Sequence, residues 1–384
     1  MNLGNNFVLL ETHRKDKDNK QNMLFTDPVD IITAYQKDDL SKSFQIVDKY
    51  TRRGFYVAGF ISYEAGYLLE NVLRPYLPQT EEPLLWFGAY KTPQVSDKPF
   101  ITKSNRDYYL TAPELSVSRS DYKINIKAIK DVISTGHVYQ INYTLKNNFN
   151  FYGDIVSFYK TLKDNQKVSY SALIGCQNKY VVSLSPELFF RISNNKIKVK
   201  PMKGTAPIIF PSRLLLNDGK NVSENVMIVD LIRNDFGRIC RYGSISVPEL
   251  FLVEKYESLF QMVSEVEGKL RKKTRMLEIL QNIFPCGSVT GAPKIRTMEI
   301  ISEIEKEKRG IYTGSIGLLT PTELKMNVAI RTITINKNTG DGIMGLGSGI
   351  VWDSNPQSEY EEVLLKSKFL TEPLGYFEIF ETMR

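Results

Sequence analysis

The lysine in the segment "PMKGTAP" (201–207) stands between a strand-like run and a Gly-Thr-x-Pro turn of this 384-residue chain. Lys203 is therefore either a surface cation or a buried amine. A free lysine titrates near ~10.4, and burial lowers this pKa until the amine is uncharged and can act as a nucleophile. Glu187 in "SPELFF" could exchange protons beside it. Taken alone, the pattern fits an ordinary surface lysine better than a nucleophile.

Three glutamates on predicted helices could together hold a metal ion. Glu359 and Glu362 share one face of the last predicted helix, and Lys366 lies one turn beyond Glu362. Glu224 is a polar residue on a helix whose other face is apolar. Glutamates from separate helices that converge in a cavity form an oxygen-only site, which suits Mg²⁺. The alternatives are an exposed last helix with an i,i+4 pair of Glu362 and Lys366, and a solvent-exposed Glu224, and the spacing alone favours them.

Two further features could bind an anionic ligand. Arg331 stands in the apolar run "NVAIRTITI", where an arginine is costly unless it is paired, and its planar fork suits a carboxylate. The alternative is an outward residue of an alternating strand. The glycine-dense segment "GLGSGIV" (345–351) would let a ligand approach the backbone, whose N–H groups can hold an anion. A bulge or bend of a sheet explains these glycines equally well.

Composition argues against several classes of protein. The chain has only two histidines, His13 and His137, and three widely separated cysteines, Cys176, Cys240 and Cys286. Serine or cysteine triads, histidine-rich metal sites and a disulfide framework are therefore poor expectations. The net charge of +7 is spread along the chain without a basic run that could bind nucleic acid. Because the N-terminus is polar and no apolar run reaches ~18 residues, we expect a cytoplasmic protein that does not enter the membrane.

The elements that must position these residues follow a mixed order. Residues 1–110 are predicted to form strands with one or two helices, and a polar connector follows at 97–120. A helix is expected from an N-cap at Ser120 to Gly136, and others at 219–233, 276–284, 293–308 and from Pro356 onward. Strands are expected at 138–151, through 180–205, and at 311–319, 325–336 and 342–352. This irregular alternation favours an α+β fold with large antiparallel sheets over a doubly wound sheet.

Taken in order, the segments resemble the motifs of one enzyme family. They are "YQINYT", "SLSPELFF", "PMKGTAP", "SENVMIVDLIRND", "QMVSEVEGKL", "FPCGSVTGAPKIRTMEII", "GIYTGSIG", "NVAIRT" and "GSGIVWDSNPQSEYEEVLLK". The chain thus resembles the chorismate-utilising enzymes: anthranilate, aminodeoxychorismate, isochorismate and salicylate synthases. The match covers about residues 120–370, and "LLET", "GFISYEAGY" and "LLWFGAY" resemble the N-terminal part of the two aminating members.

The resemblance implies an architecture of two large, mostly antiparallel sheets surrounded by helices. It also implies an N-terminal part (1–115), a chorismate-binding catalytic part (116–372) and a tail (373–384). The tail "GYFEIFETMR" resembles the opening strand of aminodeoxychorismate lyase, a pyridoxal-phosphate enzyme, to which some homologues are fused. We therefore expect a lyase domain fused after the C-terminus, or a remnant of one.

The resemblance further implies roles for individual residues. Glu224 and Glu362 would hold Mg²⁺, with Glu359 close by. The substrate carboxylates would be held, and the pocket lined, by Arg331, Tyr312, Lys366, the backbone of Gly347, Ser348 and Gly349, and the side chains of Thr205 and Thr290.

Three positions distinguish the members of the family. Gln140 stands where isochorismate and salicylate synthases carry a lysine that activates water. Lys203 stands where anthranilate synthases usually have alanine and aminodeoxychorismate synthases have lysine, and Gln261 replaces a histidine of anthranilate synthases. The resemblance therefore implies an aminodeoxychorismate synthase component I, with anthranilate synthase component I as the alternative. Lys203 would be its nucleophile and Glu187 its proton donor, with ammonia supplied by a glutamine amidotransferase partner, and the product would serve p-aminobenzoate and folate synthesis.

Overall fold

The computed structural model describes residues 3–15, 19–103, 106–209, 211–255, 259–371 and 379–380. In the described part of the chain, the strands form two sheets, and every strand pair is antiparallel except β22 with β7. The first sheet has the order β22 (Ile379–Phe380), β7 (Tyr108–Thr111), β9 (Gln140–Gly153), β21 (Asp341–Ile350), β20 (Thr332–Asn336), β11 (Lys179–Ser185), β10 (Tyr170–Cys176), β1 (Phe7–Glu11), β2 (Asn22–Thr26) and β6 (Gln94–Ser96), and β8 (Glu114–Leu115) and β17 (Gly291–Ala292) also pair with β9.

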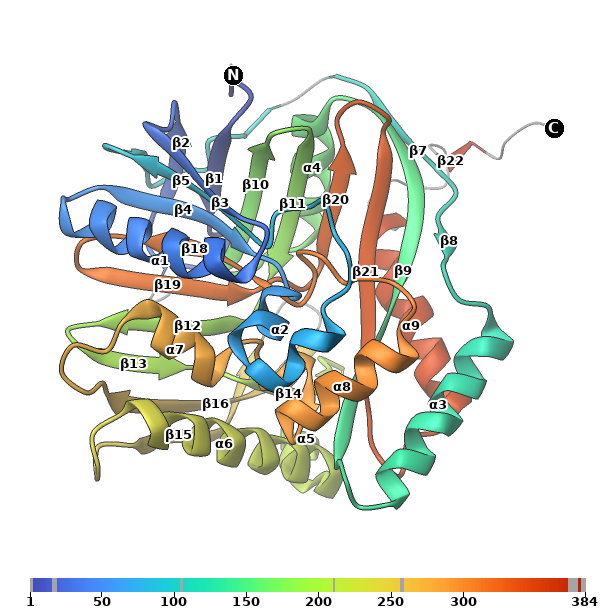
Figure 1. Ribbon diagram of the computed structural model, residues 1–384. Helices are drawn as coiled ribbons and strands as arrows, with labels where there is room; N and C mark the ends of the chain where they lie inside the picture. The colour runs from blue at the N-terminus through green and yellow to red at the C-terminus, as the bar shows by residue number, and fades with distance from the viewer. Residues whose placement is uncertain are drawn as a thin grey trace.

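The second sheet faces the first (Figure 1). Its strands have the order β14 (Met202–Pro207), β16 (Leu259–Lys269), β13 (Lys196–Val199), β12 (Leu188–Ser193), β19 (Glu323–Val328), β18 (Ser315–Leu319), β4 (Tyr56–Ile61), β5 (Leu85–Tyr90) and β3 (Asp30–Ala34), and β15 (Ser246–Lys255) pairs with β16. The predicted α+β fold of two large antiparallel sheets is confirmed.

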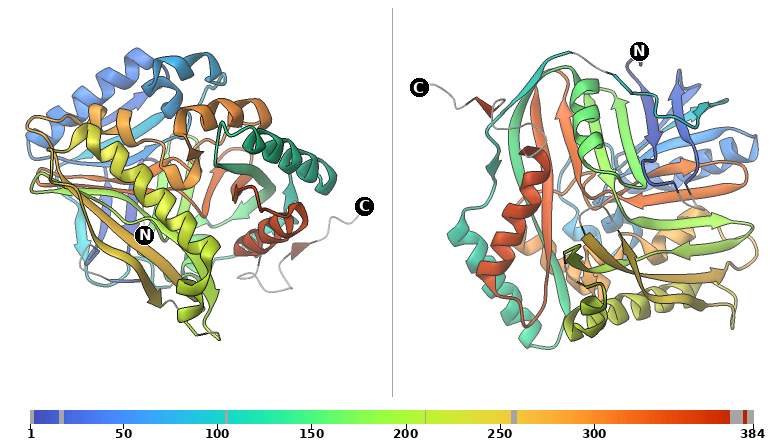
Figure 2. Two further views of the ribbon diagram at one scale, coloured as in Figure 1. Left: turned by 90° about the horizontal axis from the view of Figure 1, so that it is seen from below. Right: turned by 180° about the vertical axis from the view of Figure 1, so that it is seen from behind.

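Helices surround the two sheets, as Figures 1 and 2 show. They are α1 (Lys37–Arg52), α2 (Ala65–Leu69), η1 (Asn71–Tyr76), α3 (Arg119–Ser134), α4 (Ile155–Asn165), α5 (Arg213–Asn217), α6 (Gly219–Ile239), α7 (Met276–Ile283), η2 (Gly287–Val289), α8 (Lys294–Ile304) and α9 (Pro356–Thr371). Within the described ranges, no helix combines the length and the apolar character that a membrane span requires.

Apolar periodicity in the helices determines which face of each helix packs against a sheet. The predicted stripe of α3, from Tyr122 to Ile133, packs with α4 and α9 on the outer face of the first sheet. Helices α1, α6 and α7 bury a second apolar cluster against the second sheet. The predicted N-cap of α3 at Ser120 is wrong by two residues, because the hydroxyl of Ser118 accepts the Asp121 N–H at 3.1 Å and begins the helix earlier.

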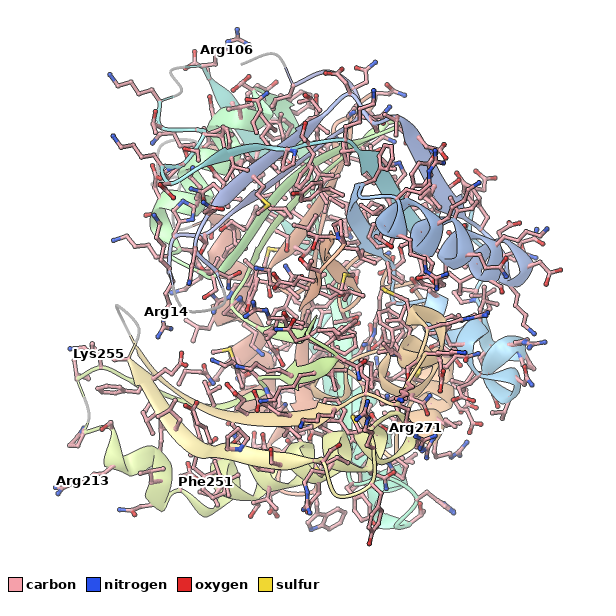
Figure 3. The ribbon with its side chains drawn as sticks, turned by 90° about the vertical axis from the view of Figure 1, so that its left-hand side faces the viewer. Arg14, Arg106, Arg213, Phe251, Lys255 and Arg271 are labelled. Atoms are coloured by element: carbon pink, nitrogen blue, oxygen red, sulfur yellow. The ribbon has the colours of Figure 1, made fainter. Side chains whose placement is uncertain are left out.

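The N-terminal part completes both sheets instead of forming a sheet of its own. Strand β1 pairs with β10 in the first sheet, and β4 pairs with β18 in the second. Side chains such as Val8 and Trp86 fill a core between the sheets. The loop after β1 is also tied to β15 by an ion pair of 3.0 Å between Arg14 and Glu254, and Figure 3 shows Arg14 near the end of β15 at Lys255. Of the predicted lyase-like tail, only Ile379–Phe380 lies within the described residues, so that prediction is not tested.

Two chain segments pass from one sheet to the other, side by side. One joins β11 to β12 and carries Glu187, and the other joins β19 to β20 and carries Arg331. The hydroxyl of Ser185 donates to the carbonyl of Val328 at 2.6 Å, and the Val328 N–H donates to the carbonyl of Glu187 at 3.1 Å. The prediction of one strand through 325–336 is therefore wrong. Arg331 has a φ of 50° between two strands of different sheets, and the apolar run is continuous only because both halves are buried.

A buried arginine joins the N-terminal part to β9, the strand that pairs with the glycine-rich β21. The Arg309 guanidinium, 7% exposed, forms two hydrogen bonds with Glu305 at 2.7 and 2.8 Å. It also donates to the carbonyls of Val289 at 2.8 Å and Asn142 at 2.6 Å. Its centre lies 4.4 Å from the ring centroid of Tyr63, which stacks beneath it.

We expect Arg309→Ala to lower the free energy of unfolding by about 3–5 kcal/mol, because it leaves the buried Glu305 carboxylate without its partner. Urea denaturation would measure the loss. Arg296→Ala removes an exposed ion pair on α8, with Glu299 at 2.7 Å, and serves as the control with an expected loss below about 1 kcal/mol. Equal losses in the two variants would contradict the role of Arg309.

Candidate active site

Three glycines form a track without side chains along one face of β21. Met344, Leu346 and Ile350 point into the core under α3 and α9, so Gly345, Gly347 and Gly349 lie on the opposite face. A Cβ atom at Gly345 would lie 2.1 Å from the ring of Tyr312. One at Gly349 would lie 2.4 Å from the Gln140 amide nitrogen and 3.8 Å from the Lys203 Nζ. Other parts of the chain therefore occupy the space that side chains would need here.

A bulge in β14 carries Lys203 to this track. Met202 pairs with Val263 and Thr205 pairs with Gln261, so β14 contains one residue more than β16 between these pairs. Gly204 takes the left-handed conformation that such a bulge needs, with a φ of 81°. The Gln261 side-chain amide donates to the Gly204 carbonyl at 2.8 Å. Lys203 is half-buried, and its amine reaches from the second sheet to Gly349 of the first.

Glu187 lies at the sheet crossing beside Lys203. Its carboxyl is 5% exposed, and its Oε1 accepts the Ser288 hydroxyl at 2.8 Å. Burial raises the pKa of Glu187 to about 7, and Ser288, Lys203 and the Met202 N–H partly oppose this rise. A carboxyl group with such a pKa can both give and take a proton near neutral pH. The predicted pair of an amine and a carboxyl group is therefore brought together by the fold.

Gln140 and Thr290 border the same end of the track. Gln140 is 1% exposed, and its Oε1 has no hydrogen-bond partner among the described residues. A buried acceptor of this kind is costly unless a ligand supplies a donor. Thr290 is fully buried; its hydroxyl donates to the Cys286 carbonyl at 3.0 Å, and its own carbonyl accepts the Asn142 N–H at 2.8 Å. Of the other predicted pocket threonine, Thr205, the side chain lies outside the described part of the structure.

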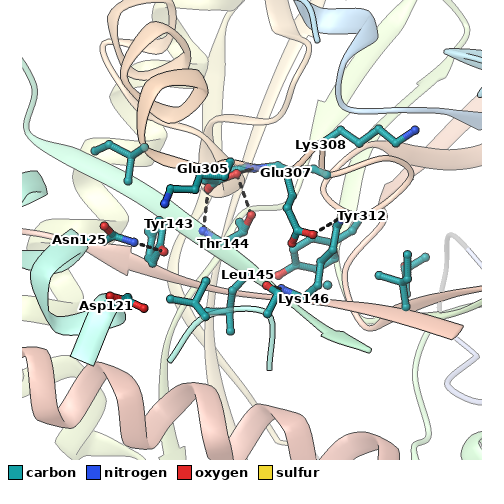
Figure 4. Close-up of a pocket in the computed structure, with 18 of the residues that line it drawn as sticks. Asp121, Asn125, Tyr143, Thr144, Leu145, Lys146, Glu305, Glu307, Lys308 and Tyr312 are labelled. Atoms are coloured by element: carbon teal, nitrogen blue, oxygen red, sulfur yellow. Dashed lines mark hydrogen bonds and ion pairs between the residues drawn. The ribbon is translucent and has the colours of Figure 1, made fainter. Parts of the chain in front are cut away.

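Tyr312 lies at the far end of the track, over Gly345. Both residues line a cavity of about 320 Å³ (Figure 4). In this cavity the Glu305 carboxylate accepts the N–H of Thr144 at 2.7 Å and its hydroxyl at 2.9 Å. Since two residues of a strand span about 6.8 Å, the amine and Tyr312 lie over glycines some ~14 Å apart. Tyr312 and Lys203 therefore mark opposite ends of the track.

Lys366 and Arg331 occupy separate positions. The Lys366 amine donates to the Gly347 carbonyl at 2.7 Å, in the middle of the track, and pairs with Glu362 at 2.7 Å. Arg331, at the second sheet crossing, donates to the Gln166 Oε1 at 2.7 Å. The Ser348 side chain is buried on the face opposite to the glycines, so only its backbone can face a ligand on the track.

The three predicted magnesium ligands lie on two helices that flank these strands. Glu224 is half-buried on α6, which packs against β14, and the other two are on α9, which packs against β21. Glu359 is 7% exposed and accepts the Ser354 hydroxyl at 2.7 Å, whereas Glu362 is exposed and paired with Lys366. Within the described ranges, no three acidic, histidine or cysteine side chains gather closely enough to hold a metal ion. The oxygen-only donor set suits Mg²⁺, but the structure does not bring the set together.

Sequence reasoning missed the partners of Glu187. Neither Ser288, which bonds to Glu187, nor Cys286, which contacts Ser288, was singled out as part of the site. The signal available was their place in the motif "FPCGSVTG", directly before Thr290.

Comparison with known proteins places these features in a family. Residues 6–372 match the family described as chorismate binding enzyme. Anthranilate synthase component 1 of Saccharolobus solfataricus is 33% identical over 377 residues, which cover 91% of this chain and 86% of that protein. Aminodeoxychorismate synthase component 1 of Escherichia coli is 35% identical over 270 residues, which cover 68% of this chain and 59% of that protein. The chain thus spans about three fifths of that relative.

Solved structures share the fold. Anthranilate synthase component I of Streptococcus pneumoniae superposes with a TM-score of 0.79 at 23% identity, covering 93% of each chain. The menaquinone-specific isochorismate synthase of Escherichia coli has a TM-score of 0.76 at 15% identity, covering 97% of this chain and 89% of that one. The paired sheets, the family match and the relatives agree: this chain belongs to the chorismate-binding enzymes.

Proposed function

We propose that this chain is an aminodeoxychorismate synthase component I, a transferase that converts chorismate and ammonia to 4-amino-4-deoxychorismate. The observation that carries the proposal is the placement of the Lys203 amine over Gly349 and beside the buried Glu187. Anthranilate synthases usually have alanine at this position, so an amine here supports a reaction that uses it. The product is a precursor of p-aminobenzoate and folate.

In the proposed reaction Lys203 is the nucleophile, and Glu187 donates and later accepts a proton. The Lys203 amine adds to ring carbon 2 through its lone pair, the double bond shifts, and the 4-hydroxyl leaves as water with the proton of Glu187. Ammonia then adds to carbon 4, the double bond shifts back, and the carbon–nitrogen bond to Lys203 breaks. One proton passes from the new ammonium group to Glu187, so chorismate and ammonia become the amine and water. Two displacements replace one difficult substitution.

The rest of the track supports binding of the substrate. The backbone from Gly347 to Gly349 would hold one carboxylate of the substrate. Lys366, Tyr312 and Arg331 would supply polar groups for the other carboxylate. Thr290 and Thr205 would line the pocket. Glu224, Glu359 and Glu362 would hold Mg²⁺, which when bound would neutralise a substrate carboxylate. For Glu362 to bind Mg²⁺, its carboxylate must leave Lys366. The proposed steps at Lys203 and Glu187 do not depend on the metal ion.

Ammonia would come from a glutamine amidotransferase partner, as the relation to the aminating members of the family suggests. A lyase domain after the C-terminus remains part of the same proposal, because the last residues resemble the start of that enzyme. The lyase would convert the product to p-aminobenzoate.

Anthranilate synthesis is the second candidate. The Saccharolobus solfataricus anthranilate synthase aligns with 91% of this chain, more than the 68% for the Escherichia coli aminodeoxychorismate synthase. Anthranilate synthases have a histidine where Gln261 stands, and that position supports the elimination of pyruvate. A glutamine amide cannot donate a proton as an acid, and here it instead holds the Gly204 carbonyl. These features favour the first candidate.

We expect chorismate and ammonia to give p-aminobenzoate only when aminodeoxychorismate lyase is added. Lys203→Ala should remove most of this product while the protein stays folded, because the nucleophile is lost. Lys200→Ala is the matched control: Lys200 pairs with Glu265 at 3.6 Å, and its loss should leave turnover within about twofold. Chromatography of the products measures both. Fluorescent anthranilate without lyase would favour the second candidate, and unchanged turnover of Lys203→Ala would exclude the covalent step.

We also expect activity to disappear on chelation and to return with Mg²⁺. Glu362→Ala should raise the Mg²⁺ concentration needed for half-maximal activity by about 10-fold or more, because it removes a ligand. Glu361→Ala, the exposed neighbour on α9, is the control and should leave this concentration unchanged. Turnover that is indifferent to chelators would contradict the metal assignment.

A further inference from the structure

Two small side chains form a series of contacts that ends at Glu187. Cys286 contacts Ser288, and Ser288 contacts Glu187. Cys286 and Ser288 flank the first residue of η2, and both are buried. The Cys286 Sγ lies 3.2 Å from the Ser288 Oγ, which lies 2.8 Å from the Glu187 Oε1. A Cβ atom at Gly287 would lie 2.4 Å from Leu231, so this turn is pressed against α6. The series is therefore held by the packing of the turn.

The chemistry of the three groups determines which group donates in each hydrogen bond of the series. Burial and the nearby Glu187 raise the pKa of the Cys286 thiol to about 12, so the thiol keeps its proton. A serine hydroxyl has one hydrogen to donate and two lone pairs to accept with. The hydrogen of Ser288 goes to Glu187, and its lone pairs are turned toward the thiol. The thiol thus donates to the hydroxyl, and the hydroxyl donates to the carboxyl group.

We propose that Ser288, backed by Cys286, is a positioning residue that holds Oε1 of Glu187 as an acceptor and so confines the exchangeable proton to Oε2. The inference rests on the proposed function, in which Glu187 is the acid that protonates the leaving hydroxyl. An acid works only when its proton lies within hydrogen-bond reach of the group that receives it. A carboxyl group that is free to rotate would present the proton on either oxygen. A hydroxyl clamped to one oxygen removes the unproductive arrangement.

Other charged and polar groups face the same carboxyl group. Lys203 approaches from β14, and the Met202 N–H donates to it. Lys203 and the Met202 N–H favour the charged form, as Ser288 does, and burial opposes them. When the Ser288 hydroxyl is lost, fewer groups counteract the effect of burial on the pKa of Glu187. The pKa of Glu187 in Ser288→Ala is therefore expected to lie higher than in the natural protein.

The pH dependence of stability measures this pKa without substrate. In the folded state the pKa of Glu187 is raised from 4.5 to about 7. Between these values the folded state binds more protons than the unfolded state, so stability falls as pH rises through this window. Glu187→Gln removes that fall. The difference between a protein and its Glu187→Gln counterpart, followed by urea denaturation from pH 4 to 9, therefore reports the folded-state pKa.

The test compares Ser288→Ala with the natural protein in that measurement and in steady-state turnover of chorismate with ammonia. We expect the upper end of the stability window to move up by about one pH unit, corresponding to one lost hydrogen bond to a carboxylate. The kcat should fall about 10-fold or more, within the range of general acid catalysis, while KM changes less than about twofold. Ser288→Thr, which keeps the hydroxyl, should restore both quantities. Cys286→Ala should give a smaller shift in the same direction.

Controls separate positioning from packing. Ser43→Ala on α1 removes another buried hydroxyl, which donates to the Thr33 carbonyl at 2.8 Å, and should move neither the window nor kcat. If Ser288→Ala does not fold, Ser288→Cys keeps the volume with a weaker donor and should give an intermediate shift. An unmoved window in the folded variant would overturn the inference. The lack of aminodeoxychorismate from the natural protein would instead remove the proposed function, and the stability window would still report on the contact between Ser288 and Glu187.

Discussion

The reach of the Lys203 side chain from β14 of the second sheet to Gly349 on β21 of the first decides where the proposed chemistry can occur. A Cβ atom at Gly349 would lie 3.8 Å from the Lys203 amine, an ordinary contact, and 2.4 Å from the Gln140 amide nitrogen, which fills the space beside this glycine. The bulge at Gly204 turns the lysine toward this strand and not along its own sheet. A primary amine from one sheet is thereby delivered to the backbone of the other.

The two sheet crossings and the Arg309 network keep this contact in register. The crossings share hydrogen bonds through Ser185 and Val328, so Glu187 cannot shift without moving both sheets. Arg309 binds the carbonyls next to the site and is itself covered by Tyr63 of the N-terminal part. The N-terminal strands are therefore part of the support for the site, although they supply no predicted catalytic residue.

The carboxyl group of Glu187 and the carboxylates on α9 lie in different electrostatic surroundings. Around Glu187 burial dominates, and it yields an acid that titrates near neutral pH beside an amine. On α9 the carboxylates are satisfied by neighbours, Glu359 by Ser354 and Glu362 by Lys366. Glu187 and Lys203 therefore lie beside each other, whereas the carboxylates of Glu359 and Glu362 are bound to Ser354 and Lys366. Family membership follows from the whole chain, and the choice of reaction depends on a few side chains such as Lys203 and Gln261.

The motifs of the sequence were enough to predict the fold class and the family, and they singled out Lys203, Glu187 and Gly349, which the structure places near one another. Helical faces such as that of α3 were also predictable, because apolar spacing and capping depend on residues close together in the chain. The pair of Glu362 with Lys366 was predictable for the same reason, whereas the division of the run at Arg331 and the bond from Ser288 to Glu187 were not. These depend on contacts between distant segments, 101 residues apart for the last pair, which only the packing of the two sheets brings together.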